Sequence, residues 1–326
     1  MTAWDRVHRT QGRLTIVACL VGIVAGLSGW TDVGLRAQLL WLAPLVVLFG
    51  LPHGALDPLV ARERAEAAWG RRWIAPFLVL YLLAVGLVLV LWWALPKAAL
   101  VSFLLLSILH FALGDESRES APRHAERLVA GSTPIVFPCA FWSEEVTAAF
   151  NLLLPAQQAL APEAVGLAGA FALVPVGSAA LAAAVSRCRD LSLPGSGGRR
   201  AGAALALLFL RSTLFVVAPP LIAFAIYFCL DHSSKHLLQV ARQLGSPDAS
   251  RALPAAIRSG LPLTIVTALF AAASGVAFWS RGLSVDAAIA RPLFIGLSAL
   301  TVPHMIVCWL CEPSDDAATP LETLPC

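Results

Sequence analysis

The sequence predicts an all-α integral membrane protein, a polytopic helical bundle of about ten transmembrane helices (range about eight to ten). Hydrophobic residues make up 58% of the 326 residues and charged residues 13%, roughly half the usual ~25% charged share. The mean hydropathy is +0.78. Apolar residues fall in blocks of about twenty, the length that a helix needs to cross ~30 Å of hydrocarbon. A soluble chain of this length has too much surface to cover with so few charges.

Ten apolar stretches are the expected spans. In chain order they are 14–27, 39–59, 74–95, 98–114, 128–142, 165–185, 201–217, 221–238, 261–279 and 293–310. Two prolines interrupt the fifth, and a proline pair opens the eighth, where the first helical turn tolerates proline. Arg211 lies in the middle of the seventh without an obvious partner. It either bends its span, lines a cavity or marks a misplaced boundary.

Basic residues in short loops predict the orientation. Clusters of arginine lie before the first span and after the second, fourth, sixth and eighth, whereas the alternate loops hold little more than Arg36, Lys97 and Arg281. We therefore expect a multi-pass protein of the cell (inner or plasma) membrane with both termini in the cytoplasm. The net charge of +3 is small, which argues against a nucleic-acid partner. Residues 1–326 are expected to form a single membrane-embedded catalytic domain, with 193–200 (LPGSGGRR) as a flexible cytoplasmic linker within it.

Five of the seven histidines lie inside predicted spans, where ionisable groups are costly and are functional candidates by default. They are His53, His110, His232, His236 and His304. Their spans are the second, fourth, eighth and tenth, which all run in the same direction across the membrane. At ~1.5 Å of rise per residue, all five rings would lie roughly 4–10 Å from the midplane on the cytoplasmic side. One shared layer is what a polar site in the core of a bundle requires.

The spacing of these histidines favours a metal site over isolated structural histidines. His232 and His236 are four residues apart, so both rings face the same side of a helix. Proline precedes both His53 and His304 and would kink each helix towards a polar cavity, although proline is also common in membrane helices for other reasons. An all-imidazole set suits zinc, copper, iron or nickel better than calcium or magnesium. The residues alone do not select the metal or the ligands among the five.

Carboxylates and aromatic residues accompany the histidines. A ligand histidine usually donates its other N–H to a carboxylate or carbonyl, and Asp57 and Asp115 follow His53 and His110 closely enough to do this or, alternatively, to cap helix ends. Asp231 and Lys235 have the spacing of a helical ion pair.

The predicted spans also supply close-packing and apolar residues around the histidines. Gly50 and Gly54 would let another backbone or a ligand come close. Phe111, Tyr227 and Phe228 would form an apolar pocket open to a hydrophobic substrate from the lipid.

Four motifs resemble those of the Brp/Blh family of membrane-bound beta-carotene 15,15'-dioxygenases. They are Gly50-Leu51-Pro52-His53-Gly54-Ala55-Leu56-Asp57, Leu109-His110-Phe111 with Asp115, Tyr227-Phe228 through His232-Ser233-Ser234-Lys235-His236, and Pro303-His304-Met305. They extend over positions 50 to 305 in the order of the family. One departure is Ala112, where glycine is common in the family.

The resemblance implies an iron(II)-dependent oxygenase that cleaves the central double bond of beta-carotene with O2 to give two molecules of all-trans-retinal. It implies His53, His110, His232 and His236 as catalytic residues and ligands of Fe2+. His304 would then lie next to the metal or face the substrate. The residues themselves add Asp57, Asp115, Phe111, Tyr227 and Phe228 around the metal or in the substrate pocket. The implied partners are beta-carotene, O2 and the lipid bilayer.

Other functions stay open on the sequence. A histidine-rich membrane desaturase holds two irons and often uses adjacent histidine pairs, and this sequence has no His-His. A metal or proton transporter needs access from both faces, whereas these histidines cluster on one side. A retinal-binding opsin would need a suitable lysine, and Lys235 lies between two histidines instead of in the last helix.

Overall fold

The fold was obtained as a computed structural model that describes residues 3–29, 33–114, 124–191, 196–243 and 249–311. Every regular element over these residues is a helix, as the sequence predicts. The major helices before residue 160 are α1 (Ala3–Leu27), α2 (Leu35–Leu45), α3 (Leu51–Gly54), α4 (Asp57–Trp69), α5 (Ile74–Ala94), α6 (Pro96–Gly114), α7 (His124–Phe141) and α8 (Ser143–Leu153). Those after it are α9 (Pro162–Leu191), α10 (Ser196–Val217), α11 (Pro220–Ala225), α12 (Ser234–Gln243), α13 (Ala249–Ser280) and α14 (Val285–Cys311). Short η segments are Val46–Gly50 (η1), Gly70–Arg72 (η2), Ala156–Gln158 (η3) and Ile226–Ser233 (η4).

Seven helical stretches in the described part are long and apolar enough to cross a membrane. They are Ala3–Leu27, Leu35–Arg72, Ile74–Ala94, Pro96–Gly114, Pro162–Leu191, Ala249–Ser280 and Val285–Cys311. The other three predicted spans are also helical, in α7, in α10 and from α11 to α12, but they are shorter in their apolar part or more polar. The protein is therefore a multi-pass membrane protein, and apolar length alone supports seven of the ten predicted crossings.

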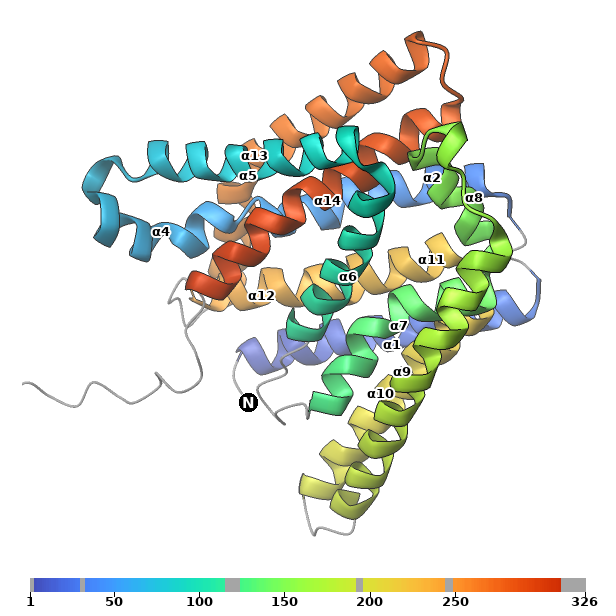
Figure 1. Cartoon of the computed structure of the whole chain (residues 1–326). Coiled ribbons are helices and arrows are strands. Elements are labelled where there is room, and N and C mark those ends of the chain that lie inside the picture. Colours follow the sequence, from blue (N-terminus) through green and yellow to red (C-terminus); the bar gives the residue numbers. More distant parts are fainter. Residues whose placement is uncertain (1–2, 30–32, 115–123, 192–195, 244–248, 312–326) are drawn as a thin grey trace, which may run out of the picture.

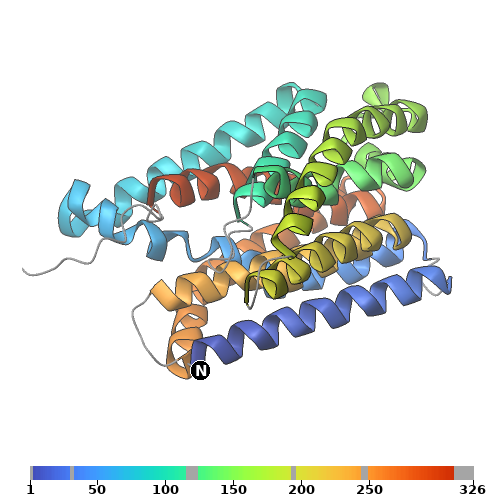
Figure 2. The same ribbon diagram turned by 90° about the horizontal axis from the view of Figure 1, so that it is seen from below.

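Helix α14 lies in the middle of the bundle, where it packs against α13, α5, α4 and α2. Helices α7, α9 and α10 pack on one another, and they join the rest of the bundle where α7 packs on α6 and α10 packs on α1. The lower ends of α9 and α10 project away from the other helices in Figure 1. The first residues of α1 and the last residues of α14 lie at the same end of the bundle in both views (Figures 1 and 2). The largest buried apolar cluster joins α1, α2, α6, α10, α11, η4 and α14.

Two of the η segments are π-helices, which the sequence analysis did not predict. Segment η1 ends directly before Leu51 and Pro52, and η4 contains His232. Pro52 lacks an N–H and its ring clashes with the carbonyl four residues earlier, which explains a wider turn at η1. π-Helical turns are rare and occur frequently at functional sites. Both segments lead into histidines of the predicted cluster.

The two π-helices pack closely on each other through Gly50. A Cβ added at this glycine would lie 2.7 Å from Cε1 of Phe228, whereas one added at Gly54 would meet nothing within 4 Å. The absence of a side chain is therefore needed for packing at Gly50, and Gly54 faces open space. The two glycines of one motif have different roles.

Helix α10 begins at Ser196, so residues 196–200 are helical where the sequence predicted a flexible linker over 193–200. Residues 193–195 lie outside the described part. Glycine in a helix costs only about 0.5–1 kcal/mol relative to alanine, so the two glycines at the start of α10 do not prevent a helix there.

A buried ion pair joins α7 to α9. The Nε and Nη2 atoms of Arg187 donate to the two carboxylate oxygens of Glu126 at 2.5 and 2.7 Å. The side chains are 7% and 6% exposed. Arg187 therefore lies within α9, whereas the sequence predicted a loop at this position, after the sixth span.

Candidate metal centre

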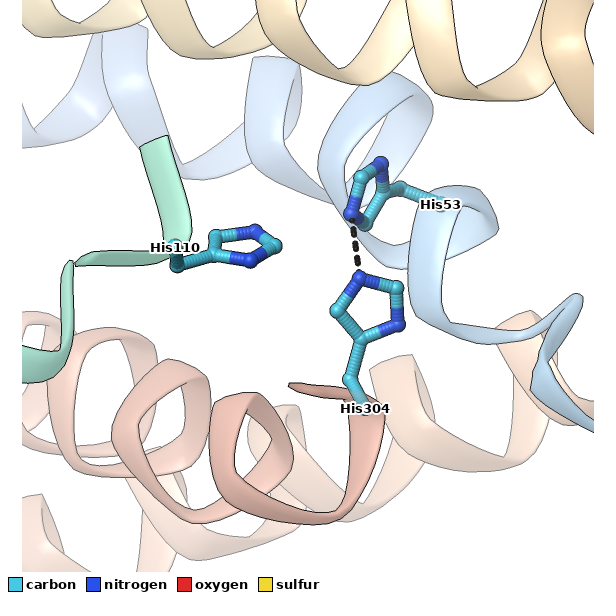
Figure 3. A group of neighbouring side chains, drawn as sticks. All are labelled: His53, His110 and His304. Atoms are coloured by element: carbon cyan, nitrogen blue, oxygen red, sulfur yellow. Dashed lines mark hydrogen bonds between the residues drawn. The ribbon is translucent and has the colours of Figure 1, made fainter. Parts of the chain in front are cut away.

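The five histidines predicted to share one layer meet in the structure. They come from five elements: His53 from α3, His110 from α6, His232 from η4, His236 from α12 and His304 from α14. The ring centre of His53 lies 4.2 Å from that of His236 and 4.5 Å from that of His304. The ring centre of His110 lies 4.7 Å from that of His232 and 5.1 Å from that of His304. Figure 3 shows the rings of His53, His110 and His304 pointing toward one another.

The ring nitrogens lie at the spacing of ligands that share an ion. The Nε2 atoms of His53 and His304 are 2.9 Å apart, and so are the Nε2 atoms of His110 and His232. Imidazole nitrogens bind metals such as zinc at about 2.0–2.1 Å, so two neighbouring ligands at a right angle would be separated by about 3 Å. One group of possible ligand atoms, from His53, His110 and His304, lies within 4.8 Å of one another.

Burial and donor chemistry also fit a transition metal. His53, His232 and His304 are at most 5% exposed. The Nδ1 atom of His53 is buried and has no hydrogen-bond partner among the described residues, although buried polar atoms are normally bonded. Imidazole is a favourable ligand for zinc, copper, iron and nickel. The cluster therefore fits the predicted metal, without selecting iron among these ions.

Asp57 contacts His304, which is not the histidine that its spacing suggested. Its Oδ1 lies 2.6 Å from Nδ1 of His304, and its Oδ2 accepts a 2.8 Å hydrogen bond from the hydroxyl of Tyr81. The sequence placed Asp57 one helical turn after His53. The turn at Ala55 and Leu56 separates α3 from α4, so the two residues do not share one continuous helix. Asp115 lies outside the described residues.

An aromatic wall of Phe111, Tyr227 and Phe228 covers one side of His232. Their ring centres lie 5.0, 6.3 and 6.0 Å from that of His232, and all three side chains are buried. The predicted apolar residues therefore lie beside the histidine cluster, and the centre combines a metal-binding donor set with an apolar surface.

Comparison with known proteins identifies the family. A family described as "Beta-carotene 15,15'-dioxygenase" matches residues 44–311, a range that includes all five clustered histidines. The chain belongs to this family. It is therefore an enzyme, a carotenoid cleavage dioxygenase, and no solved structure matches it.

Two curated relatives of this dioxygenase illustrate the match. The chain is 30% identical over 271 residues to the beta-carotene 15,15'-dioxygenase of an uncultured marine bacterium, 66A03, covering 82% of this chain and 92% of that protein. It is 29% identical over 336 residues to the probable beta-carotene 15,15'-dioxygenase Blh of Halobacterium salinarum, covering 94% of each. The likeness therefore extends over nearly the whole length of both proteins.

A buried ionic network supports the segment of this dioxygenase that carries His232. Lys235 contacts Oδ1 of Asp231 at 2.9 Å, which confirms the ion pair predicted from their spacing. Arg211 of α10 donates from Nη2 to Oδ2 of the same aspartate. Arg211 and Asp231 are both 4% exposed. The arginine without an obvious partner in the sequence therefore joins α10 to η4.

Two residues at the site were missed by the sequence analysis. Tyr81 bonds Asp57, and Sγ of Cys308 lies 3.5 Å from Nε2 of His304. Cys308 also belongs to a second group of possible ligand atoms, with His236 and His304. Two features of the sequence could have indicated them. Cys308 follows His304 by four residues, which places both on one face of a helix. Tyr81 places a hydroxyl in an apolar span, and a buried tyrosine hydroxyl needs a hydrogen-bond partner.

Proposed function

We propose that this dioxygenase cleaves the central double bond of beta-carotene with O2 to give two molecules of all-trans-retinal, and that it depends on Fe2+. The observation that carries the proposal is the convergence of imidazoles from five elements within the apolar bundle, in a chain of this family. The names of both relatives, which specify beta-carotene 15,15'-dioxygenase activity, support the substrate and the bond.

We propose His53, His110, His232 and His236 as the catalytic metal ligands. Support comes from the 2.9 Å separation of the Nε2 atoms of His110 and His232 and from the closeness of the rings of His53 and His236. When bound, ferrous iron would supply the activation of dioxygen. The protein's own contribution is to hold the four ligand rings, which come from four separate elements, in place by packing and hydrogen bonds.

The aromatic wall of Phe111, Tyr227 and Phe228 is proposed to hold the polyene beside the histidines and to exclude water. Buried aromatic surface binds an extended apolar chain without requiring polar contacts. Fixing the reacting double bond next to the metal ligands would account for much of the catalysis by orientation. A substrate dissolved in the bilayer would reach this apolar surface without passing through water.

We further propose that residues 1–326 form one membrane-embedded catalytic domain in the inner or plasma membrane, with both termini in the cytoplasm. The arginine-rich loops support this orientation, as does the position of both ends of the described chain at one end of the bundle (Figure 1). Reporter fusions at each terminus, active only on one side of the membrane, test it. Opposite sides for the two termini would refute it.

The decisive test of function is expression in bacteria that accumulate beta-carotene. The wild-type protein should replace the orange pigment by retinal, which is measured by chromatography. The variants His53→Ala, His110→Ala, His232→Ala and His236→Ala should each lose bound iron and retinal formation. His124→Ala, at an exposed position at the start of α7, is the matched control and should retain both.

The outcomes of this experiment separate the proposal from its rivals. Persistent beta-carotene with folded, iron-loaded wild-type protein would refute the cleavage reaction. Two irons per chain by metal analysis would favour a desaturase-like diiron centre. Uptake of metal into proteoliposomes, without any carotenoid product, would favour a transporter.

A further inference from the structure

Tyr81, Asp57 and His304 form a hydrogen-bonded chain that joins three helices. The hydroxyl of Tyr81 on α5 donates to Oδ2 of Asp57 on α4 at 2.8 Å. The other oxygen of Asp57 lies 2.6 Å from Nδ1 of His304 on α14. These residues are separated by 24 and 247 positions in the sequence, so only the packing of the helices brings them together.

The direction of these hydrogen bonds determines the tautomer of His304. An ionised carboxylate only accepts hydrogen bonds, so Nδ1 of His304 must carry the proton and donate it to Asp57. In the neutral imidazole, Nε2 then holds the lone pair that a metal ion would use. This nitrogen lies 2.9 Å from Nε2 of His53 and points toward His53 and His110 (Figure 3).

The charge of Asp57 requires a cation nearby. Its side chain is fully buried at 0% exposure, and its hydrogen-bonding partners within the described residues are Tyr81 and His304. A buried charge is normally paired or associated with a metal. Among the described residues, Asp231 is a second carboxylate beside the cluster, and it is already compensated by Arg211 and Lys235. The carboxylate of Asp57 is therefore placed to compensate the charge of a cation that the imidazoles would hold.

From these contacts we infer that His304 is a fifth metal ligand, oriented for this role by Asp57 and Tyr81. The inference rests on the proposed function, because it concerns the ion that the other four histidines are proposed to hold. It differs from the four-ligand set implied by the family resemblance, in which His304 lies next to the metal or faces the substrate. Asp57 and Tyr81 are positioning residues in this arrangement, since they act through His304.

Cobalt binding to the purified, metal-free, full-length protein tests the inference without relying on activity. Co2+ is a spectroscopic probe whose visible absorption depends on its coordination number. Asp57→Asn should weaken Co2+ binding about 10–100-fold, the usual effect of removing the carboxylate partner of a ligand histidine. Tyr81→Phe removes only a hydroxyl and should weaken it by a smaller factor. His304→Ala should bind Co2+ with a changed absorption spectrum, because one ligand is lost.

Asp286→Asn is the matched control for Asp57→Asn. Asp286 lies in the first turn of α14 and its Oδ1 contacts Nε of Arg36 at 2.7 Å, so this variant removes a carboxylate that does not contact the histidines, and Co2+ affinity should stay at the wild-type value. Wild-type Co2+ affinity in both Asp57→Asn and Tyr81→Phe, or an unchanged cobalt spectrum in His304→Ala, would overturn the inference. Absence of Co2+ and Fe2+ binding by the wild-type protein would refute the proposed metal function itself, which is a different result.

Discussion

Replacing Gly50 with alanine should destabilise the protein, whereas the same change at Gly54 should not. A Cβ at position 50 would lie 2.7 Å from Cε1 of Phe228 and 3.1 Å from Cγ1 of Val46. Moving Phe228 away would disrupt the surrounding packing, because its side chain is only 7% exposed and its ring stacks on that of Phe224, with the ring centres 5.2 Å apart. A Cβ at position 54 would meet no atom within 4 Å.

The two substitutions form an internal comparison. Alanine stabilises a helix by about 0.5–1 kcal/mol relative to glycine. Both variants receive this stabilisation, so it cancels in the difference between their free energies of unfolding. What remains is the cost of overpacking at Gly50, typically about 1–3 kcal/mol. Gly50→Ala should therefore be less stable than Gly54→Ala by about 1–3 kcal/mol in its free energy of unfolding.

Equilibrium unfolding in mixed micelles, followed by tryptophan fluorescence, measures this difference. Co2+ titration should show a parallel loss of affinity in Gly50→Ala, since pushing η4 away from η1 separates His232 from His53. Equal unfolding free energies for the two variants would show that η1 and η4 do not pack through Gly50. Loss of retinal formation in a stable, metal-binding Gly54→Ala would instead indicate that the substrate occupies the open space beside Gly54.

The remaining predictions concern the ionic networks and the metal. Glu126→Gln breaks the bidentate bond to Arg187 and leaves this buried charge with the longer 3.8 Å contact to Asp190, so the unfolding free energy should fall, by at most about 3–5 kcal/mol, with iron per chain unchanged by metal analysis. Asp231→Asn should cost a similar amount because it removes the carboxylate that pairs with Arg211 and Lys235. It should also weaken Co2+ binding because it loosens η4, and wild-type affinity would contradict that link. Chelation should abolish retinal formation, and Fe2+ but not Mg2+ should restore it, since imidazole ligands select against magnesium.

The helices and the histidine layer could be predicted from the sequence because both depend on local periodicity. Blocks of apolar residues predict where helices cross the membrane, and positions within those blocks predict the depth of His53, His110, His232, His236 and His304. The four-residue spacing of an ion pair is local in the same way, and it correctly predicted the contact between Asp231 and Lys235.

The errors arose where local spacing was extended across a break in the helix. Asp57 was expected to support His53, but the turn at Ala55 and Leu56 redirects its carboxylate toward His304. The linker predicted over 193–200 is helical from Ser196 onward, because the small cost of glycine in a helix does not prevent one there. The sequence showed no obvious partner for Arg211, and the structure pairs it with Asp231 of η4.

By itself, the sequence determined that this dioxygenase lies in a membrane, that its helices carry five histidines at one depth, and that apolar residues surround them. Only the tertiary structure decided which nitrogens face each other, that Tyr81 and Asp57 support His304, and that Gly50 and Gly54 differ in role. The physical reason is distance along the chain. A helical period relates residues three or four positions apart, whereas the contact between Asp57 and His304 joins residues 247 positions apart and exists only once α4 and α14 have packed.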